Sequence, residues 1–78
     1  MNSMFVTIGN DDLFGNNLKV TDRNAGGAII WQGYLEAKDE ITVPCRKNDA
    51  GYGNITTFQD NNPGIGRSFL KDGDRVSL

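Results

Sequence analysis

The chain has 78 residues, with eight Lys and Arg, ten Asp and Glu, one Cys and no His. A chain of this length forms at most one domain, 1–78, with a small core. A single Cys excludes an internal disulfide, and without His it also excludes a Cys/His zinc site. The net charge of −2 offers no basic surface, so neither nucleic acid nor an anionic membrane is expected as a partner.

The ends of the sequence bear on its compartment. Residues 1–4 lack the basic and apolar regions of a signal peptide, and no apolar run is long enough to span a bilayer. Together with the single Cys, these features slightly favour the cytoplasm. They also fit a phage or virion component, or a subdomain of a larger protein.

Short apolar alternations separated by loops rich in Asn, Asp and Gly are typical of an all-β domain. We expect a small sandwich or barrel of about six to eight short antiparallel strands. The expected strands cover residues 4–8, 18–21, 28–35, 41–45, 54–59, 67–70 and 75–78. Alternation along them places Met4, Val6, Ile8, Leu18, Val20, Ile41, Val43 and Cys45 inward. An inward Cys45 without a His base is expected to be an inert thiol.

Residues 28–46 contain the longest apolar run, and they are predicted to form a β-hairpin that turns at residues 36–39. Pro44 lacks an N–H, which places the second strand of this hairpin at a sheet edge. Gly33 lies near a large ring and indicates a bulge or a close backbone approach. Farther along, Asp72-Gly73 predicts a type I′ hairpin turn.

The chain resembles itself at an offset of 38 residues. The matching positions include Asn10 with Asn48, Val20 with Phe58, Asp22 with Asp60, Gly26 with Gly64, and Trp31 with Phe69. We therefore expect two repeats, about 3–40 and about 41–78, in a Greek-key-like arrangement about a pseudo-twofold axis. The alternative is convergent loop composition, because loops built from Asn, Asp and Gly match one another easily.

Two repeated Greek-key units of about forty residues are also the plan of the βγ-crystallins. The segment Phe58-Gln59-Asp60, followed by Gly66-Arg67-Ser68 and Gly73, loosely resembles their aromatic–acid–glycine hairpin. Their calcium signature is absent from this sequence. The resemblance implies the paired-Greek-key fold and carries no binding residues over.

Oxygen-rich residues in the matching loops are the candidate ligand-binding sites. They are Asn10, Asp11, Asp12 and Asp22 in the first half, and Asn48, Asp49, Tyr52 and Asp60 in the second. Calcium prefers such oxygen ligands, so it is the one cofactor that the pattern admits, with Asp11, Asp12 and Asp49 as ligands. Residues 9–15 also resemble one calcium nonapeptide of the repeats-in-toxin family. The alternative is that these residues only form Asx-turns.

The aromatic residues near these loops suggest a second kind of ligand. Exposed rings beside amide and carboxylate groups suit a sugar, and Tyr34 and Tyr52 are expected to be the more exposed rings. Trp31 is expected in the core instead, where it fills one half as Phe69 fills the other.

An enzyme is not expected, because the sequence has no His, no activated nucleophile and no phosphate-binding loop. We expect a non-enzymatic module that binds carbohydrate or calcium at the duplicated loops. The alternative is a protein-interaction or assembly subunit, namely a homo-oligomer, a phage or virion component, or a small inhibitor of a partner protein.

Overall fold

The computed structural model describes residues 2–60 and 62–78, so the predicted loop over residues 60–66 includes one position outside the described residues. The strands are β1 (Ser3–Gly9), β2 (Asn16–Asp22), β3 (Ala28–Leu35), β4 (Glu40–Arg46), β5 (Gly53–Gln59), β6 (Ile65–Leu70) and β7 (Arg75–Ser77). A 3-10 turn, η1 (Arg23–Ala25), follows β2. The all-β class and all seven predicted strand positions are confirmed. In the part of the chain that the structure describes, no helix has the length and apolar character needed to cross a membrane.

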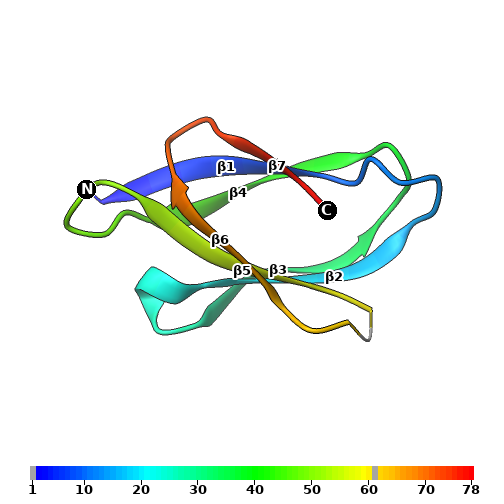
Figure 1. Ribbon diagram of the computed structural model, residues 1–78, viewed down its shortest axis with the longest axis horizontal. Helices are drawn as coiled ribbons and strands as arrows, with labels where there is room; N and C mark the ends of the chain where they lie inside the picture. Colours follow the sequence, from blue (N-terminus) through cyan, green and yellow to red (C-terminus); the bar gives the residue numbers. More distant parts are fainter. Residues whose placement is uncertain (1, 61) are drawn as a thin grey trace.

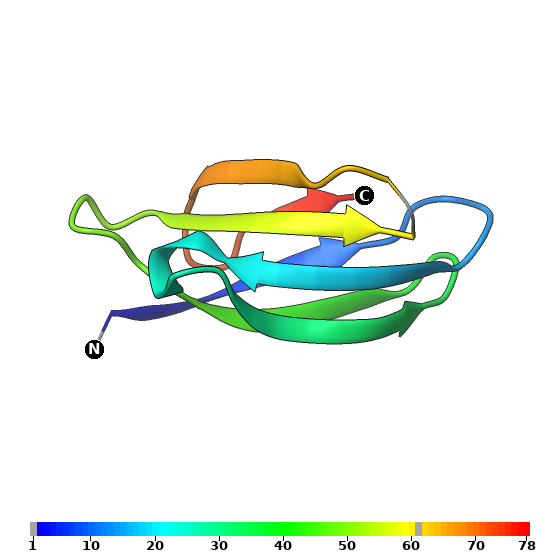
Figure 2. The same cartoon turned by 90° about the horizontal axis from the view of Figure 1, so that it is seen from below.

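The strands form two layers, which Figure 1 shows edge-on. The three-stranded sheet has the order β4-β1-β7, and the four-stranded sheet has the order β3-β2-β5-β6. The strand pairs are antiparallel except for β1 and β7, which are parallel, so the expectation of purely antiparallel strands is corrected. Figure 2 shows that the loop after β1 and the loop after β4 lie at opposite ends of the molecule.

The core lies between the two layers and consists of alternate residues from the facing strands. Its buried members are Met4, Val6, Ile8, Leu18, Val20, Leu35, Val43, Cys45, Ile55 and Leu70. Ile41 is partly buried against this cluster. The inward positions expected from strict alternation in β1, β2 and β4 are therefore confirmed.

The predicted hairpin over residues 28–46 is wrong, because its two strands belong to different sheets: β3 pairs with β2, and β4 pairs with β1. The connection between them adopts φ of 64° at Lys38 and is held by Asn10, whose backbone accepts from Lys38 N and donates to Asp39 O. These bonds carry the chain from one layer to the other. The edge position of β4, expected from Pro44, is confirmed.

The predicted type I′ hairpin at Asp72-Gly73 is also wrong. Of these two residues only Gly73 has a positive φ, of 87°, and Asp74 N donates to Lys71 O, which is the pattern of a type II turn. This turn likewise changes layers, from β6 in the four-stranded sheet to β7 in the three-stranded sheet.

A β-bulge in β3 changes which of its side chains face the core. Val20 is opposite Trp31, whereas Thr21 is opposite Ile29, so Ile30 is the extra residue. As a result Ile30 and Trp31 both pack against the core, while Ile29 is 56% exposed. The close approach expected at Gly33 is confirmed, because a Cβ there would lie 3.2 Å from the Trp31 indole.

The structure does not support the 38-residue alignment within the strands. A shift of one residue moves a side chain to the other face of a sheet, and this offset matches buried Val20 with outward-facing Phe58. At an offset of 37, by contrast, buried Leu18 and Val20 match buried Ile55 and Thr57. The expected role of Phe69 as the core counterpart of Trp31 is wrong, because Phe69 is 74% exposed.

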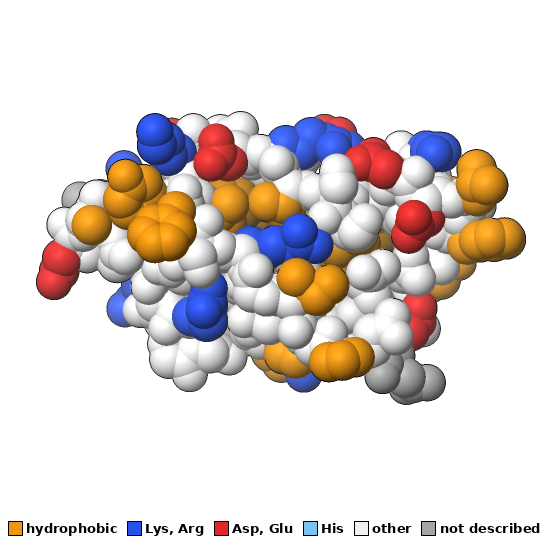
Figure 3. All heavy atoms as spheres, viewed as in Figure 1, with side chains coloured by type: hydrophobic (Ala, Val, Ile, Leu, Met, Phe, Trp, Pro, Cys, Tyr) orange, Lys and Arg blue, Asp and Glu red, His pale blue; other side chains and the backbone are white. Residues whose placement is uncertain are grey.

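Several large apolar side chains stay exposed at the two ends of the molecule. Leu13 and Phe14, in the loop between β1 and β2, are 78% and 76% exposed. Figure 3, seen from the same direction as Figure 1, shows hydrophobic atoms projecting at that end and a second group at the opposite end. Such protruding side chains are candidates for contacts with another molecule.

Candidate functional site

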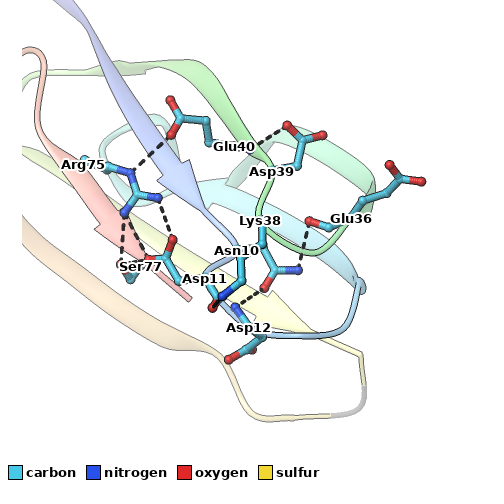
Figure 4. Close-up of polar contacts among 9 residues, drawn as sticks. All are labelled: Asn10, Asp11, Asp12, Glu36, Lys38, Asp39, Glu40, Arg75 and Ser77. Carbon is cyan, nitrogen blue, oxygen red and sulfur yellow. Dashed lines mark hydrogen bonds and ion pairs between the residues drawn. The ribbon is translucent and has the colours of Figure 1, made fainter.

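Asn10 is buried and braces the loop after β1, as Figure 4 shows. Its Nδ2 donates to Phe14 O at 2.9 Å, to Leu35 O at 3.1 Å and to Glu36 O at 3.3 Å. Its Oδ1 accepts from Asp12 N at 3.1 Å and closes an Asx-turn. Because both polar atoms of the side chain are used within the protein, Asn10 is a structural residue here.

Asp11 is held by the end of β7 (Figure 4). Its two carboxylate oxygens accept from Arg75 Nη2 at 2.8 Å and Nη1 at 3.1 Å, and the Ser77 hydroxyl also donates to it. These hydrogen bonds, led by that of Arg75, hold the pKa of Asp11 well below its usual value and raise that of Arg75. Gly9 permits the arrangement, because a Cβ there would lie 2.0 Å from the guanidinium.

The sequence matches of these residues lie at the other end of the molecule. Asn48 Oδ1 accepts from Ala50 N and Tyr52 N, both at 3.0 Å, while Asp49 is exposed. Tyr52 packs edge-on against the Phe69 ring, with the centroids 5.5 Å apart. Here too the asparagine side chain shapes its own loop.

Asp22 is buried at the end of β2 and is also committed to the fold. Its Oδ1 accepts from Asn24 N at 3.0 Å, which caps η1, and its Oδ2 accepts from Arg46 N at 2.8 Å. Both oxygens of this carboxylate therefore hold backbone groups, one of them from the opposite sheet.

The predicted calcium ligands do not come together. Asp11 and Asp12 belong to the loop after β1 and Asp49 to the loop after β4, and these two loops lie at opposite ends of the molecule (Figure 2), so the three cannot share one ion. Across residues 2–60 and 62–78, no group of three or more His, Cys, Asp or Glu could hold a metal ion. Cys45 is buried, and its pKa is raised to about 11, first by desolvation and then by Asp22 and Asp72.

A hollow of about 450 Å³ lies at the outer face of the four-stranded sheet. It begins where β2 and β3 pair and ends at the turn after β5. Its lining residues are Asn17, Leu18, Lys19, Gln32, Gly33, Tyr34, Phe58, Asp60 and Asn62.

The floor and wall of the hollow follow from the strand register. Lys19 is opposite Gln32 on one side and Phe58 on the other, and its Nζ lies 4.6 Å from the centroid of the Phe58 ring. Tyr34 is opposite Asn17 and is 61% exposed. The result is a charged and aromatic floor beside a ring that is open to solvent.

Two neighbours fix the wall residues. A Cβ at Gly15 would lie 2.2 Å from the Tyr34 hydroxyl, so the ring lies directly against the backbone of the loop after β1. Asp60 has φ of 45° and its Oδ1 accepts from Asn17 N at 3.2 Å and Asn17 Nδ2 at 3.1 Å. Tyr34 and Asn17 are therefore held in place before any ligand binds.

Of the eight predicted ligand-binding residues, the hollow includes one, Asp60. Asn17, Lys19, Gln32 and Phe58 were not among the predicted residues, which all came from the loops or the strand ends beside them. The signal that could have identified Lys19, Gln32 and Phe58 is the alternation along β2, β3 and β5, which turns every second side chain away from the core.

No family model matches the chain, and comparisons with curated proteins and with solved structures likewise give no match. The resemblance to the βγ-crystallins therefore gains no support from these comparisons.

Proposed function

We propose that this chain is a non-enzymatic domain that binds carbohydrate in the hollow on its four-stranded sheet. The observation that carries the proposal is an exposed Tyr34 ring beside the amide groups of Asn17, Gln32 and Asn62. The volume of about 450 Å³ lies in the range of small-molecule sites. A sugar offers an apolar ring face together with hydroxyl groups, and this surface complements both.

The polar groups of the hollow suit hydroxyl recognition. Amide side chains both donate and accept hydrogen bonds, as a hydroxyl group does, and Lys19 adds a charged donor. Because Asn17 is held by Asp60 and Tyr34 lies against Gly15, little ordering is needed when a ligand binds. Such preorganisation raises affinity without adding contacts.

The carboxylates support binding rather than hydrolysis. Glycosidases use a pair of Asp or Glu residues on either side of the bond that is cleaved. Asp60 is the one carboxylate among the described residues that line the hollow, and its Oδ1 already holds Asn17. The proposed site therefore differs from the predicted one in its location, and calcium forms no part of it.

The test is a titration with soluble cello-, malto-, xylo- and chito-oligosaccharides, followed by amide NMR signals. We expect shifts at residues 17–19, 32–34 and 58–60, and loss of binding in Tyr34→Ala. Tyr34→Phe keeps the ring and should retain most of the affinity. Phe5→Ala removes another exposed aromatic residue, 54% exposed on β1, and serves as the matched control. Shifts confined to other residues, or none with any sugar, would refute the proposal.

We further propose that the chain contains two related units, about 3–40 and about 41–78, in a Greek-key arrangement. The strand order β3-β2-β5-β6 supports this proposal. If β2 is exchanged with β5 and β3 with β6, the result is the same sheet read from its other edge. Asn10 and Asn48 also each accept a hydrogen bond from the backbone two residues later. The loops then align at an offset of 38 residues and the strands at 37, so the two units differ by one-residue shifts between loops and strands.

A second candidate function is assembly with further copies of the chain. Leu13 and Phe14 favour it, because they are exposed on a loop whose backbone accepts a hydrogen bond from buried Asn10 at Phe14 O. Sedimentation velocity at increasing concentration tests this candidate. Association that is lost in Leu13→Ser/Phe14→Ser supports it, whereas a monomer at every concentration rejects it.

A further inference from the structure

The outer face of the four-stranded sheet has a different charge from the rest of the molecule. Lys19 projects from β2 on this face, and Arg23 follows at the start of η1. Other outward positions on β2, β3, β5 and β6 carry no charge, among them Asn17, Thr21, Ile29, Gln32, Tyr34, Thr56, Phe58, Gly66 and Ser68. A chain with a net charge of −2 therefore presents one cationic sheet face.

Arg23 is fixed on this face by the neighbouring edge strand. Its Nη2 donates to Ser68 Oγ at 2.6 Å and to Arg67 O at 3.5 Å. The guanidinium lies over Gly66, where a Cβ would be 3.6 Å from it. Arg23 is exposed, so its remaining N–H groups can reach a ligand on the same face.

The acidic groups near this face are few or engaged elsewhere. Asp22 is buried and its oxygens hold backbone groups, and Asp11 is paired with Arg75 at the end of β7. Asp60 stands at the rim of the hollow, with one oxygen committed to Asn17. Charges of one sign gathered on one face attract ligands of the opposite charge.

We infer that the ligand of this face is an anionic carbohydrate chain, with carboxylate or sulfate groups held by Lys19 and Arg23. The inference rests on the proposed function, because Tyr34 and the amides of the hollow supply the contacts to the sugar rings. Lys19 Nζ lies over the Phe58 ring on β5, whereas Arg23 Nη2 is bonded to Ser68 on β6, so the two cations stand over neighbouring strands. Two cations placed apart in this way suit two charged groups of one polymer better than a single charged sugar.

Single-stranded nucleic acid is the other polyanion that binds to sheet faces, but the structure favours it less. Such platforms stack successive bases on several aromatic rings. Here Tyr34 is widely exposed, whereas the face of Phe58 is covered by Lys19 and its edge by Gly64. One open ring among many hydrogen-bonding groups fits a sugar chain better than a row of bases.

The test compares polygalacturonate and heparin with neutral dextran and amylose, and adds oligothymidylate as the nucleic acid. We expect an acidic polymer to bind, with an affinity that falls between 50 and 200 mM salt because exposed charges are screened. Lys19→Gln and Arg23→Gln should each weaken binding about three- to fivefold, on the scale of one exposed ion pair. Lys71→Gln makes the same charge change in the turn after β6 and should leave binding unaltered.

The outcomes separate the inference from the proposed function. Equal binding of neutral and acidic polymers, unaffected by Lys19→Gln and Arg23→Gln, would overturn the inference and leave carbohydrate binding intact. Absence of binding to all of these polymers would overturn the inference, and it would overturn the proposed function as well only if the oligosaccharide titration also gave no shifts. Tighter binding of oligothymidylate than of any carbohydrate, lost in the same two variants, would replace the inference with a nucleic-acid platform.

Discussion

Replacing Asn10 should destabilise the protein strongly, although it lies in a surface loop. Its side chain is fully buried and joins three backbone carbonyls to one backbone amide. Those groups belong to the loop after β1, to the last residue of β3 and to the connection that carries the chain from β3 to β4. Asn10→Ala therefore releases two layer-crossing segments at once.

The magnitude follows from the hydrogen bonds. Each contributes about 1 kcal/mol net, and a carbonyl left buried without a partner costs about 1–3 kcal/mol. Leu35 O is the buried acceptor that would be stranded. A loss of about 3–5 kcal/mol is expected, against a total free energy of unfolding of about 4–12 kcal/mol for a chain of this length.

The measurement is urea unfolding, with the midpoint and the slope compared between variants. Asn48→Ala is the matched control, because Asn48 aligns with Asn10 at the offset of 38 residues but is exposed. Its loss should cost about 1 kcal/mol or less, since water can replace its two hydrogen bonds. Asn10→Asp should be as harmful as Asn10→Ala at neutral pH, because a carboxylate cannot donate to carbonyl groups. Similar midpoints for Asn10→Ala and Asn48→Ala would show that the hydrogen bonds of the Asn10 side chain do not stabilise the fold.

Three further predictions concern single side chains. The pKa of Asp11 is lowered in the folded state, so its pairing with Arg75 stabilises the fold above pH 4, and this stabilisation is lost as the pH falls below the usual 3.8. Asp11→Asn should therefore make the free energy of unfolding depend less on pH in that acid range. The pKa of Cys45, raised to about 11, should keep the thiol unreactive to iodoacetamide in the folded protein, and stability should fall as the pH rises from 9 to 11; rapid labelling at pH 8 without denaturant would contradict this. Phe69 has φ of 59°, so Phe69→Gly should be about 1 kcal/mol more stable to urea than Phe69→Ala, which keeps the strained backbone; equal midpoints would argue against strain.

The positions of the strands could be predicted because each is a local alternation between turn-forming residues. The inward faces of β1, β2 and β4 followed from the same period of two. Sheet membership could not be predicted in this way. The residues of the turn at 36–39 are as compatible with a hairpin as with a crossing between layers. What decides between them is Asn10, which is distant in sequence and binds Lys38 and Asp39.

The candidate site depended on the same non-local information. Alternation along each strand could have placed Lys19, Gln32 and Phe58 on outward faces one by one, but nothing local shows that they are direct neighbours across β2, β3 and β5. The bulge at Ile30 was equally hidden, because an extra residue shows itself only against a paired strand. The Asn and Asp loops carry the strongest local pattern in the sequence, but the side chains of Asn10 and Asn48 complete their own turns.

The position of β1 between β4 and β7 sets the order in which the protein can assemble. The β2–β3 and β5–β6 pairs join neighbouring strands and can form early, whereas β1 must wait for partners at residues 40–46 and 75–77. On the ribosome, the three-stranded sheet therefore stays incomplete until β7 has left the exit tunnel. Until then the apolar face of β1 is incompletely covered and exposed to solvent. Folding should be slow, because it depends on pairing of strands that are distant in sequence. A nascent chain halted before residue 75 should therefore bind chaperones through this exposed apolar face.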